Sequence, residues 1–184
     1  MLYPCGKCTT GGHPGYVVGY AMRPTIRVIA VGKLKETFFK DACGDYATRL
    51  ANLVSKFELI EVTDEATPDG ASAADEASIR QREGVRILAK VGERDYVIAC
   101  DLAGKQLESP DFAQHLMDAA TFHSASTFTI IIGGSLGLDH AVLERSNFRW
   151  CFGKLTLPHQ LARVIALEQT YRAFKILRGE PYHK

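Results

Sequence analysis

The sequence predicts an α/β protein with a mostly parallel sheet and helices on both of its faces. From residue 25 onward, short β-branched or apolar segments alternate with longer segments of helical periodicity, five of each. One strand segment, residues 127–132, contains only apolar residues and threonine, which is typical of a central strand buried on both faces. The chain has 184 residues, 46% of them hydrophobic and 23% charged, and shows no internal repeat or linker, so one domain is expected.

The first half of the chain supplies three strands and two helices. The first strand is expected over residues 25–31 and ends at Gly32. The helix after it is indicated by apolar residues three and four apart: Leu34, Phe38, Phe39, Ala42, Tyr46 and Leu50. A second strand over 57–62 leads into a polar, turn-rich loop over 63–73 that we expect to be mobile. A helix around 79–90 and a third strand over 95–102 follow.

The second half supplies two more strands and three helices. Ser109 is the expected N-cap of a helix that runs to about Phe122, with Pro110 at its first position. The central strand at 127–132, a short helix at 139–145 and a strand at 149–152 come next.

The last helix is expected to run to about Leu177. Thr156 is its expected N-cap, and Pro158 falls in its first turn. Gly179 ends it and leaves an extended tail over 180–184. Apolar residues of this helix exceed what one core face needs, which favours a partner helix in a dimer over complete burial within one domain. Arg163 lies among them and is a candidate for a buried contact with an anion.

Residues 1–21 differ from the rest of the chain. They are rich in glycine, tyrosine and proline, show no period and precede a second methionine, Met22. They lack the charged start and continuous apolar stretch of a signal peptide. We expect a poorly ordered leader, added by upstream initiation or by cloning, and a single domain over 22–184.

The five cysteines do not predict a disulfide framework, because they are sparse and odd in number. Cys100 and Cys151 lie in apolar runs and are expected to be buried, reduced thiols. Cys5 and Cys8 form half of a zinc-ribbon signature, but the second pair is missing and only His13 is near. No metal site is therefore expected.

Charge and hydropathy restrict the partners. The longest clear apolar runs span about six residues, and a bilayer needs roughly 20, so no spanning helix is expected. The net charge is +1, but residues 145–184 carry +6 and residues 22–144 carry −6. This asymmetry indicates either one face for an anionic ligand or a solvated basic helix.

Ligands of such folds bind beyond the carboxyl ends of the strands, which here are residues 100–104, 133–137 and 151–157. The glycines at 133, 134 and 137 permit close approach to the backbone, or serve only a tight turn. They fit G-G-x-x-G rather than the G-x-G-x-x-G of dinucleotide loops. No phosphate loop, no G-x-S-x-G and no histidine triad is present.

Five segments carry a resemblance to a known family. They are VIAVGKLK at 28–35, IGGSLGL at 132–138, LPHQLARV at 157–164, EQTYRAFKI at 168–176 and GEPYHK at 179–184. Over residues 22–184 the chain resembles the H-type pseudouridine methyltransferases of large-subunit ribosomal RNA, in the SPOUT superfamily. The terminal PYHK together with LPHQ is highly specific, and residues 1–21 fall outside the family pattern.

The resemblance implies a C-terminal trefoil knot, a cytoplasmic homodimer, and S-adenosylmethionine as methyl donor without a metal. The implied acceptor is N3 of a pseudouridine in a stem-loop of 23S RNA on the assembled ribosome. The implied donor pocket falls on the three strand ends and comprises Cys100, Gly133, Phe152, Gly153, Lys154, Leu155, Thr156 and Leu157. The family often has leucine at position 100 and a serine-rich run at 150–157, so we expect backbone groups, not side chains, to read the adenine.

Four residues are candidates for the acceptor side of the reaction. His183 is the first candidate for the base, because imidazole titrates near neutral pH. Tyr182 is expected to stack on or orient the acceptor base, and Arg163 to hold a phosphate or a substrate carbonyl. His159 is the alternative base, although its place at a helix start also suits a cap.

The tail follows the last helix, so we expect Tyr182 and His183 of one subunit to face the donor pocket of the other. Two further interpretations stay open. One is a non-catalytic ribosome-binding protein on this fold. The other is a nucleotide-cofactor oxidoreductase, which the glycine spacing disfavours.

Overall fold

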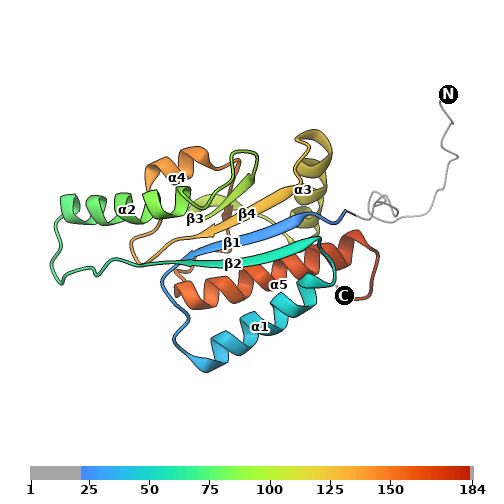
Figure 1. The fold of residues 1–184 in the computed structure, drawn as a ribbon, viewed down its shortest axis with the longest axis horizontal. Coiled ribbons are helices and arrows are strands. Elements are labelled where there is room, and N and C mark those ends of the chain that lie inside the picture. The colour runs from blue at the N-terminus through green and yellow to red at the C-terminus, as the bar shows by residue number, and fades with distance from the viewer. Residues whose placement is uncertain (1–21, 183–184) are drawn as a thin grey trace, which may run out of the picture.

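A computed structural model describes residues 22–182, which form one five-stranded sheet with strand order β2-β1-β4-β3-β5 (Figure 1). All four strand pairings are parallel. The strands are β1 (Thr25–Val31), β2 (Lys56–Val62), β3 (Tyr96–Gln106), β4 (Thr127–Ile132) and β5 (Phe148–Cys151). The predicted α/β class, the parallel sheet and the central position of β4 are confirmed.

Five helices cover both faces of the sheet (Figure 1). Helices α1 (Thr37–Ala51), α3 (Ser109–Phe122) and α5 (His159–Leu177) lie on one face, with α5 packed against both of the others. Helices α2 (Ala73–Leu88) and α4 (His140–Arg145) lie on the other face. Much of the apolar surface of α5 is therefore covered within the subunit.

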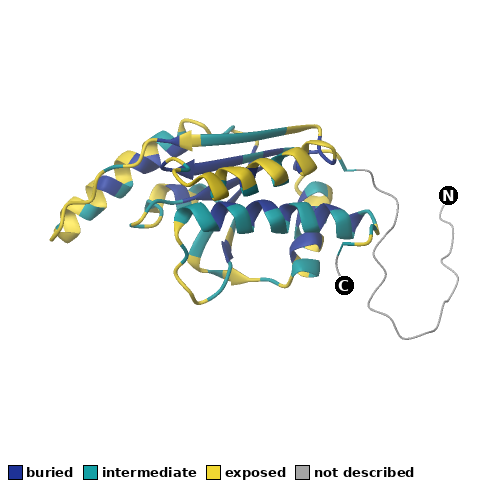
Figure 2. Cartoon of the chain, turned by 90° about the horizontal axis from the view of Figure 1, so that it is seen from below, coloured by how far each residue is buried: buried dark blue, intermediate teal, exposed yellow. Residues whose placement is uncertain are grey.

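The two cores follow the alternation of side chains along the strands. In β1, Ile26 and Val28 belong to the core under α1, α3 and α5, whereas Ile29 and Val31 belong to the smaller core under α2 and α4. All residues of β4 after Thr127 are buried. Figure 2 shows buried residues along the strands and the inner sides of the helices, with exposed residues at the outer end of α2.

Two predicted helix caps are wrong. Helix α3 begins at Ser109 and Glu108 is its N-cap, so the Ser109 hydroxyl is not used as a cap and donates to Gln169 of α5 instead (2.7 Å). Helix α5 begins at His159, and its N-cap is Pro158, which has no side-chain oxygen to accept a bond. Thr156 therefore lies in the preceding loop, before the helix.

The stripe predicted for the first helix is only partly right. Helix α1 begins at Thr37, so Leu34 precedes it, and Phe38 is 63% exposed. Leu50 lies in the core as predicted, and Cys43, which was not part of the predicted stripe, lies there as well. The mobility expected for the loop over 63–73 stays a prediction. Ser72 and Asp75 form a capping box at the start of α2.

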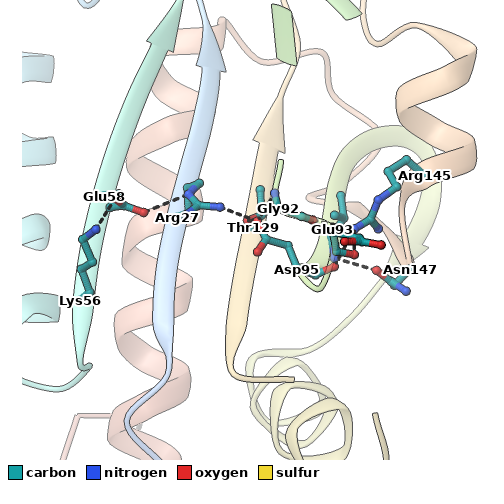
Figure 3. Close-up of polar contacts among 10 residues, drawn as sticks. Arg27, Lys56, Glu58, Gly92, Glu93, Asp95, Thr129, Arg145 and Asn147 are labelled. Carbon is teal, nitrogen blue, oxygen red and sulfur yellow. Dashed lines mark hydrogen bonds and ion pairs between the residues drawn. The ribbon is translucent and has the colours of Figure 1, made fainter. Parts of the chain in front are cut away.

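The amino ends of β1, β3 and β4 are joined by one carboxylate (Figure 3). Asp95, which precedes β3 rather than starting it, accepts hydrogen bonds on Oδ2 from Arg27 (2.5 Å), Thr129 (2.6 Å) and the backbone N–H of Gly92 (2.9 Å). Arg27 also contacts Glu58 of β2 (2.9 Å). This network lies at the end of the sheet opposite to the predicted ligand edge.

Some expectations fall outside the described part of the chain. The leader at 1–21, with Cys5 and Cys8, and the terminal residues His183 and Lys184 are among them. The trefoil knot stays a prediction, because strand order alone does not specify how the chain is threaded. Within residues 22–182, no helix is both long and apolar enough to cross a membrane.

Candidate active site

A cavity of about 550 Å³ opens at the carboxyl edge of the sheet. The three strand-end segments selected from the sequence all contribute to its wall. Within residues 22–182, the lining residues are Arg80, Cys100, Asp101, Leu102, Ile132, Gly133, Gly134, Ser135, Leu136, Gly137, Leu138, Trp150, Phe152, Gly153, Leu155, Thr156, Leu157, His159 and Ala162. Seven of the eight predicted donor-pocket residues are among them, and Lys154 is the exception.

The turn after β4 forms one wall and depends on its glycines. A Cβ on Gly133 would lie 2.9 Å from the backbone carbon and oxygen of Gly137, which no side-chain movement can relieve. A Cβ on Gly134 would lie 3.0 Å from the Glu83 carboxylate and 3.1 Å from Val31. Gly137 has φ +82°, a conformation that glycine adopts without strain. The turn is therefore a narrow backbone wall against which a planar ligand can lie closely.

The segment after β5 forms the opposite wall. Trp150 stacks on Phe112 with ring centroids 3.9 Å apart, and Phe152 meets Trp150 edge-on at 4.6 Å. This aromatic packing fixes the start of the loop. Gly153 then has φ +149° with open space around it, and Leu155 is 77% exposed at the rim. The wall is thus apolar at its base, and an exposed side chain lies at its rim.

Cys100 ends the regular part of β3 and lines the cavity as an unpaired cysteine. Burial strongly raises the pKa of its thiol, and the neighbouring Asp101 carboxylate raises it further. The thiol is therefore protonated and unreactive at neutral pH. Its contribution to the cavity is shape.

His159 reaches the cavity from the start of α5. Its Nε2 is buried without a hydrogen-bond partner and lies 3.3 Å from where a Cβ would stand on Gly32. Burial lowers the pKa of His159 below its usual value, and the charge of Arg163 lowers it further. A hydrogen bond with the Lys33 backbone opposes this shift. The ring is therefore neutral at pH 7 and directed toward the β1 turn.

Arg163 does not line the cavity, which corrects the expectation of a contact with substrate. Its side chain is completely buried. It donates to Glu61 (2.7 Å) and to the carbonyls of Val31 (2.9 Å) and Gly32 (2.6 Å). With these partners it joins the ends of β1 and β2 to α5 and has no access to a phosphate. The expected buried contact with an anion is confirmed, because the Glu61 carboxylate is that anion, whereas the expected phosphate or substrate carbonyl was wrong.

Two charged groups of the cavity wall were missed. Arg80 comes from α2, and its ion pair with Glu76 is long at 3.5 Å. No periodicity or motif places α2 beside this cavity. Asp101 directly follows Cys100 and is bound on Oδ2 by the Arg149 guanidinium. Its position in the predicted segment 100–104 was a signal that could have found it.

The described part of the tail, residues 180–182, turns back onto α5, where an extended tail was expected. Tyr182 meets the ring of Tyr171 edge-on at 4.9 Å and lies under the guanidinium of Arg172 at 4.8 Å. Its hydroxyl also donates to Glu168 (3.3 Å). Burial raises the pKa of the Tyr182 hydroxyl well above its usual value. The side chain is thus held on α5 and does not line the cavity of its own subunit.

The basic excess of the C-terminal quarter is mostly used inside the protein. Arg149, Arg163, Arg172 and Lys175 pair with Asp101, Glu61, Glu168 and Glu180 respectively, and Arg145 and Arg178 donate to backbone carbonyls. Lys154 remains exposed beside the cavity. These pairs offset much of the basic excess, and both interpretations of the charge asymmetry, a face for an anionic ligand and a solvated basic helix, stay predictions.

Comparison with known proteins gives one consistent result. The model of a family described as predicted SPOUT methyltransferase matches residues 24–183. A protein of Streptococcus thermophilus (strain CNRZ 1066), named ribosomal RNA large subunit methyltransferase H, is 54% identical over 159 residues, 86% of this chain and 99% of the relative. Relatives of the same name from Streptococcus pyogenes serotype M3 and Streptococcus suis are 51% and 48% identical over the same shares.

Proposed function

The chain belongs to the SPOUT methyltransferase family, and from this premise we propose that it methylates large-subunit ribosomal RNA with S-adenosylmethionine as donor. We propose N3 of a pseudouridine on the assembled ribosome as the acceptor atom. The observation that carries the proposal is the cavity at the carboxyl edge of the sheet, where the bulged part of β3 meets the segments after β4 and β5.

The cavity suits such a donor. Its volume lies within the roughly 300–1,000 Å³ of small-molecule sites. The narrow glycine turn and the apolar residues Phe152, Leu155 and Leu157 fit an adenine ring that is read by main-chain N–H and C=O groups. S-adenosylmethionine is consumed as a substrate, and no group of three or more potential metal ligands occurs among residues 22–182. Methyl transfer from an activated sulfonium chiefly requires that both reactants be positioned.

The acceptor imide must lose its proton. The sequence offers His183 and His159 as candidates for this base, and burial lowers the pKa of His159, which keeps its ring in the proton-accepting form. Tyr182 is proposed to orient the acceptor base. Tyr182 lies on α5, and the half-buried apolar residues Leu161, Val164 and Ile165 of α5 fit a homodimer contact. In that dimer the tail of one subunit would serve the donor pocket of the other.

The charge of the chain supports the ribosome as the form of the substrate. Residues 22–184 contain 21 basic and 21 acidic residues. Nonspecific affinity for free RNA comes from the neutralisation of phosphates by lysine and arginine, and over residues 22–184 an equal number of acidic residues offsets this attraction. Tight binding then requires a surface that several ribosomal components form together. This places the reaction on ribosomes in the cytoplasm.

Two measurements test the proposal. Isothermal calorimetry with S-adenosylmethionine should give stoichiometric binding, and its absence would favour a non-catalytic ribosome-binding protein. Methyl transfer should then be fast on ribosomes that lack the modification and at least about tenfold slower on the isolated stem-loop, a difference of about 1.4 kcal/mol in the barrier. Equal rates on the two substrates would contradict the proposed acceptor form.

A further inference from the structure

We infer that Asp101, in place of His159 or His183, is the group that takes the imide proton when the acceptor base enters the cavity. The inference rests on the proposed function, since it concerns the acceptor of that reaction. Asp101 is the one carboxylate among the lining residues within 22–182. Its position, its hydrogen bonds and the state of the neighbouring groups carry the argument.

The backbone places Asp101 at the cavity by an irregularity in β3. Cys100 and Lys105 both pair with Trp150 of β5, so the four residues between them bulge out of the sheet. Bulges next to active sites redirect side chains. Gly104 is required in this bulge, because a Cβ there would lie 2.6 Å from the Arg149 backbone. Leu102, next to Asp101, is 61% exposed and lines the cavity at its rim.

The carboxylate is oriented and keeps one oxygen available. Arg149 donates to Oδ2 from both Nε (2.7 Å) and Nη2. Oδ1 accepts only a long bond from the Ala103 N–H, at 3.4 Å. Arg149 is not a lining residue, and its side chain is 44% exposed. The arginine therefore holds the carboxylate from outside, while Oδ1 retains lone pairs for a ligand.

The other titratable and charged groups around the cavity are less suited to this role. Cys100 is held as a thiol, because its pKa is strongly raised by burial. The free nitrogen of His159 is buried against Gly32. Arg80 of α2 is a cation and accepts no proton. Asp101 is 20% exposed, so a proton that it takes can pass to solvent at the rim.

The step balances. The N3–H bond breaks and its proton moves to Asp101 Oδ1, while the electron pair stays on N3. That pair forms the bond to the methyl carbon as the bond from this carbon to the sulfonium sulfur breaks, and the sulfur keeps the latter pair. The products are the N-methylated base, a neutral thioether and a protonated Asp101, which returns its proton to water. Arg149 acts as a positioning residue throughout.

The test compares Asp101→Asn with a matched surface variant, Asp118→Asn, on α3. Single-turnover methyl transfer on ribosomes lacking the modification should fall about 100-fold or more in Asp101→Asn and stay unchanged in Asp118→Asn. The loss of rate in Asp101→Asn relative to the wild type should become smaller as the pH is raised, because the imide then ionises without a base. Asp101→Glu, which keeps the carboxylate, should recover part of the rate. Calorimetric affinity for S-adenosylmethionine and the thermal midpoint should be near those of the wild type.

The outcomes separate the inference from the proposed function. If the wild type transfers methyl groups and Asp101→Asn does so at the same rate, the inference is wrong and the proposed function stands. A deficit that is independent of pH, or one explained by lost donor affinity, also overturns the inference, since a merely structural or donor-binding role would produce it. If the wild type transfers no methyl group, the inference about Asp101 and the proposed function are both wrong.

Discussion

Replacing Arg163 by methionine tests whether this residue is structural or contacts substrate. The change removes one ion pair with Glu61 and two charge-assisted hydrogen bonds to the carbonyls of Val31 and Gly32, while it keeps most of the buried volume. Breaking a buried pair by removing one partner costs about 3–5 kcal/mol. For a chain of this size, that corresponds to a drop of roughly 6–20 °C in Tm.

The assay is urea denaturation of wild type, Arg163→Met and Arg163→Lys, followed by fluorescence of the single tryptophan, Trp150. Arg163→Lys keeps the charge and should lose less stability than Arg163→Met. At a temperature where the variants remain folded, affinity for S-adenosylmethionine should stay within about threefold, or roughly 0.7 kcal/mol. A stability loss below about 1 kcal/mol combined with a rate loss above 100-fold would refute this reasoning and restore the contact with substrate.

Four further predictions follow from the same structure. Gly133→Ala should weaken donor binding at least about tenfold by calorimetry, because its Cβ would meet backbone atoms at 2.9 Å. Asp95→Asn should lower the free energy of unfolding by about 3 kcal/mol in urea, since three donors share its Oδ2. Burial lowers the pKa values of His115 and His159, so the unfolded chain binds more protons than the folded one below pH about 6.5. The free energy of unfolding should therefore fall as the pH drops below that value. Replacing both histidines by glutamine should make the urea midpoint depend less on pH between pH 5 and 7. A chain that starts at Met22 should fold and methylate as well as the full chain, and a truncated protein that fails to fold would contradict the leader interpretation.

The strands and the ligand edge could be predicted because each depends on local pattern. The apolar run at β4 and the turn glycines after it indicate a buried strand and a close backbone approach whatever the rest of the chain does. The order β2-β1-β4-β3-β5 could not be predicted in this way, since parallel strands can be joined in several orders with the same local sequence. Helix caps failed where the cap was decided by tertiary contacts, as when Ser109 bonds Gln169 of a distant helix.

The residues of the candidate site show the same difference between features set by local sequence and features set by tertiary packing. The three segments that contain Cys100, Gly133 and Phe152 could be predicted because the carboxyl ends of parallel strands share one edge of the sheet, and the family resemblance then singled out these residues. Arg80 was missed because it lies on α2. Only the tertiary packing of α2, on the same face of the sheet as α4, brings Arg80 to the cavity. Arg163 was assigned to substrate because burial and charge can be read from the sequence, whereas the partner that neutralises the charge cannot.

The central claim is methyl transfer to ribosomal RNA, and mass spectrometry of that RNA tests it most directly. Ribosomes that lack the modification are incubated with the protein and S-adenosylmethionine, and the large-subunit RNA is digested and analysed. We predict that a single pseudouridine of a stem-loop gains one methyl group, and that this gain requires both the protein and the donor. RNA that gains no methyl group under conditions where the protein binds the donor would contradict it.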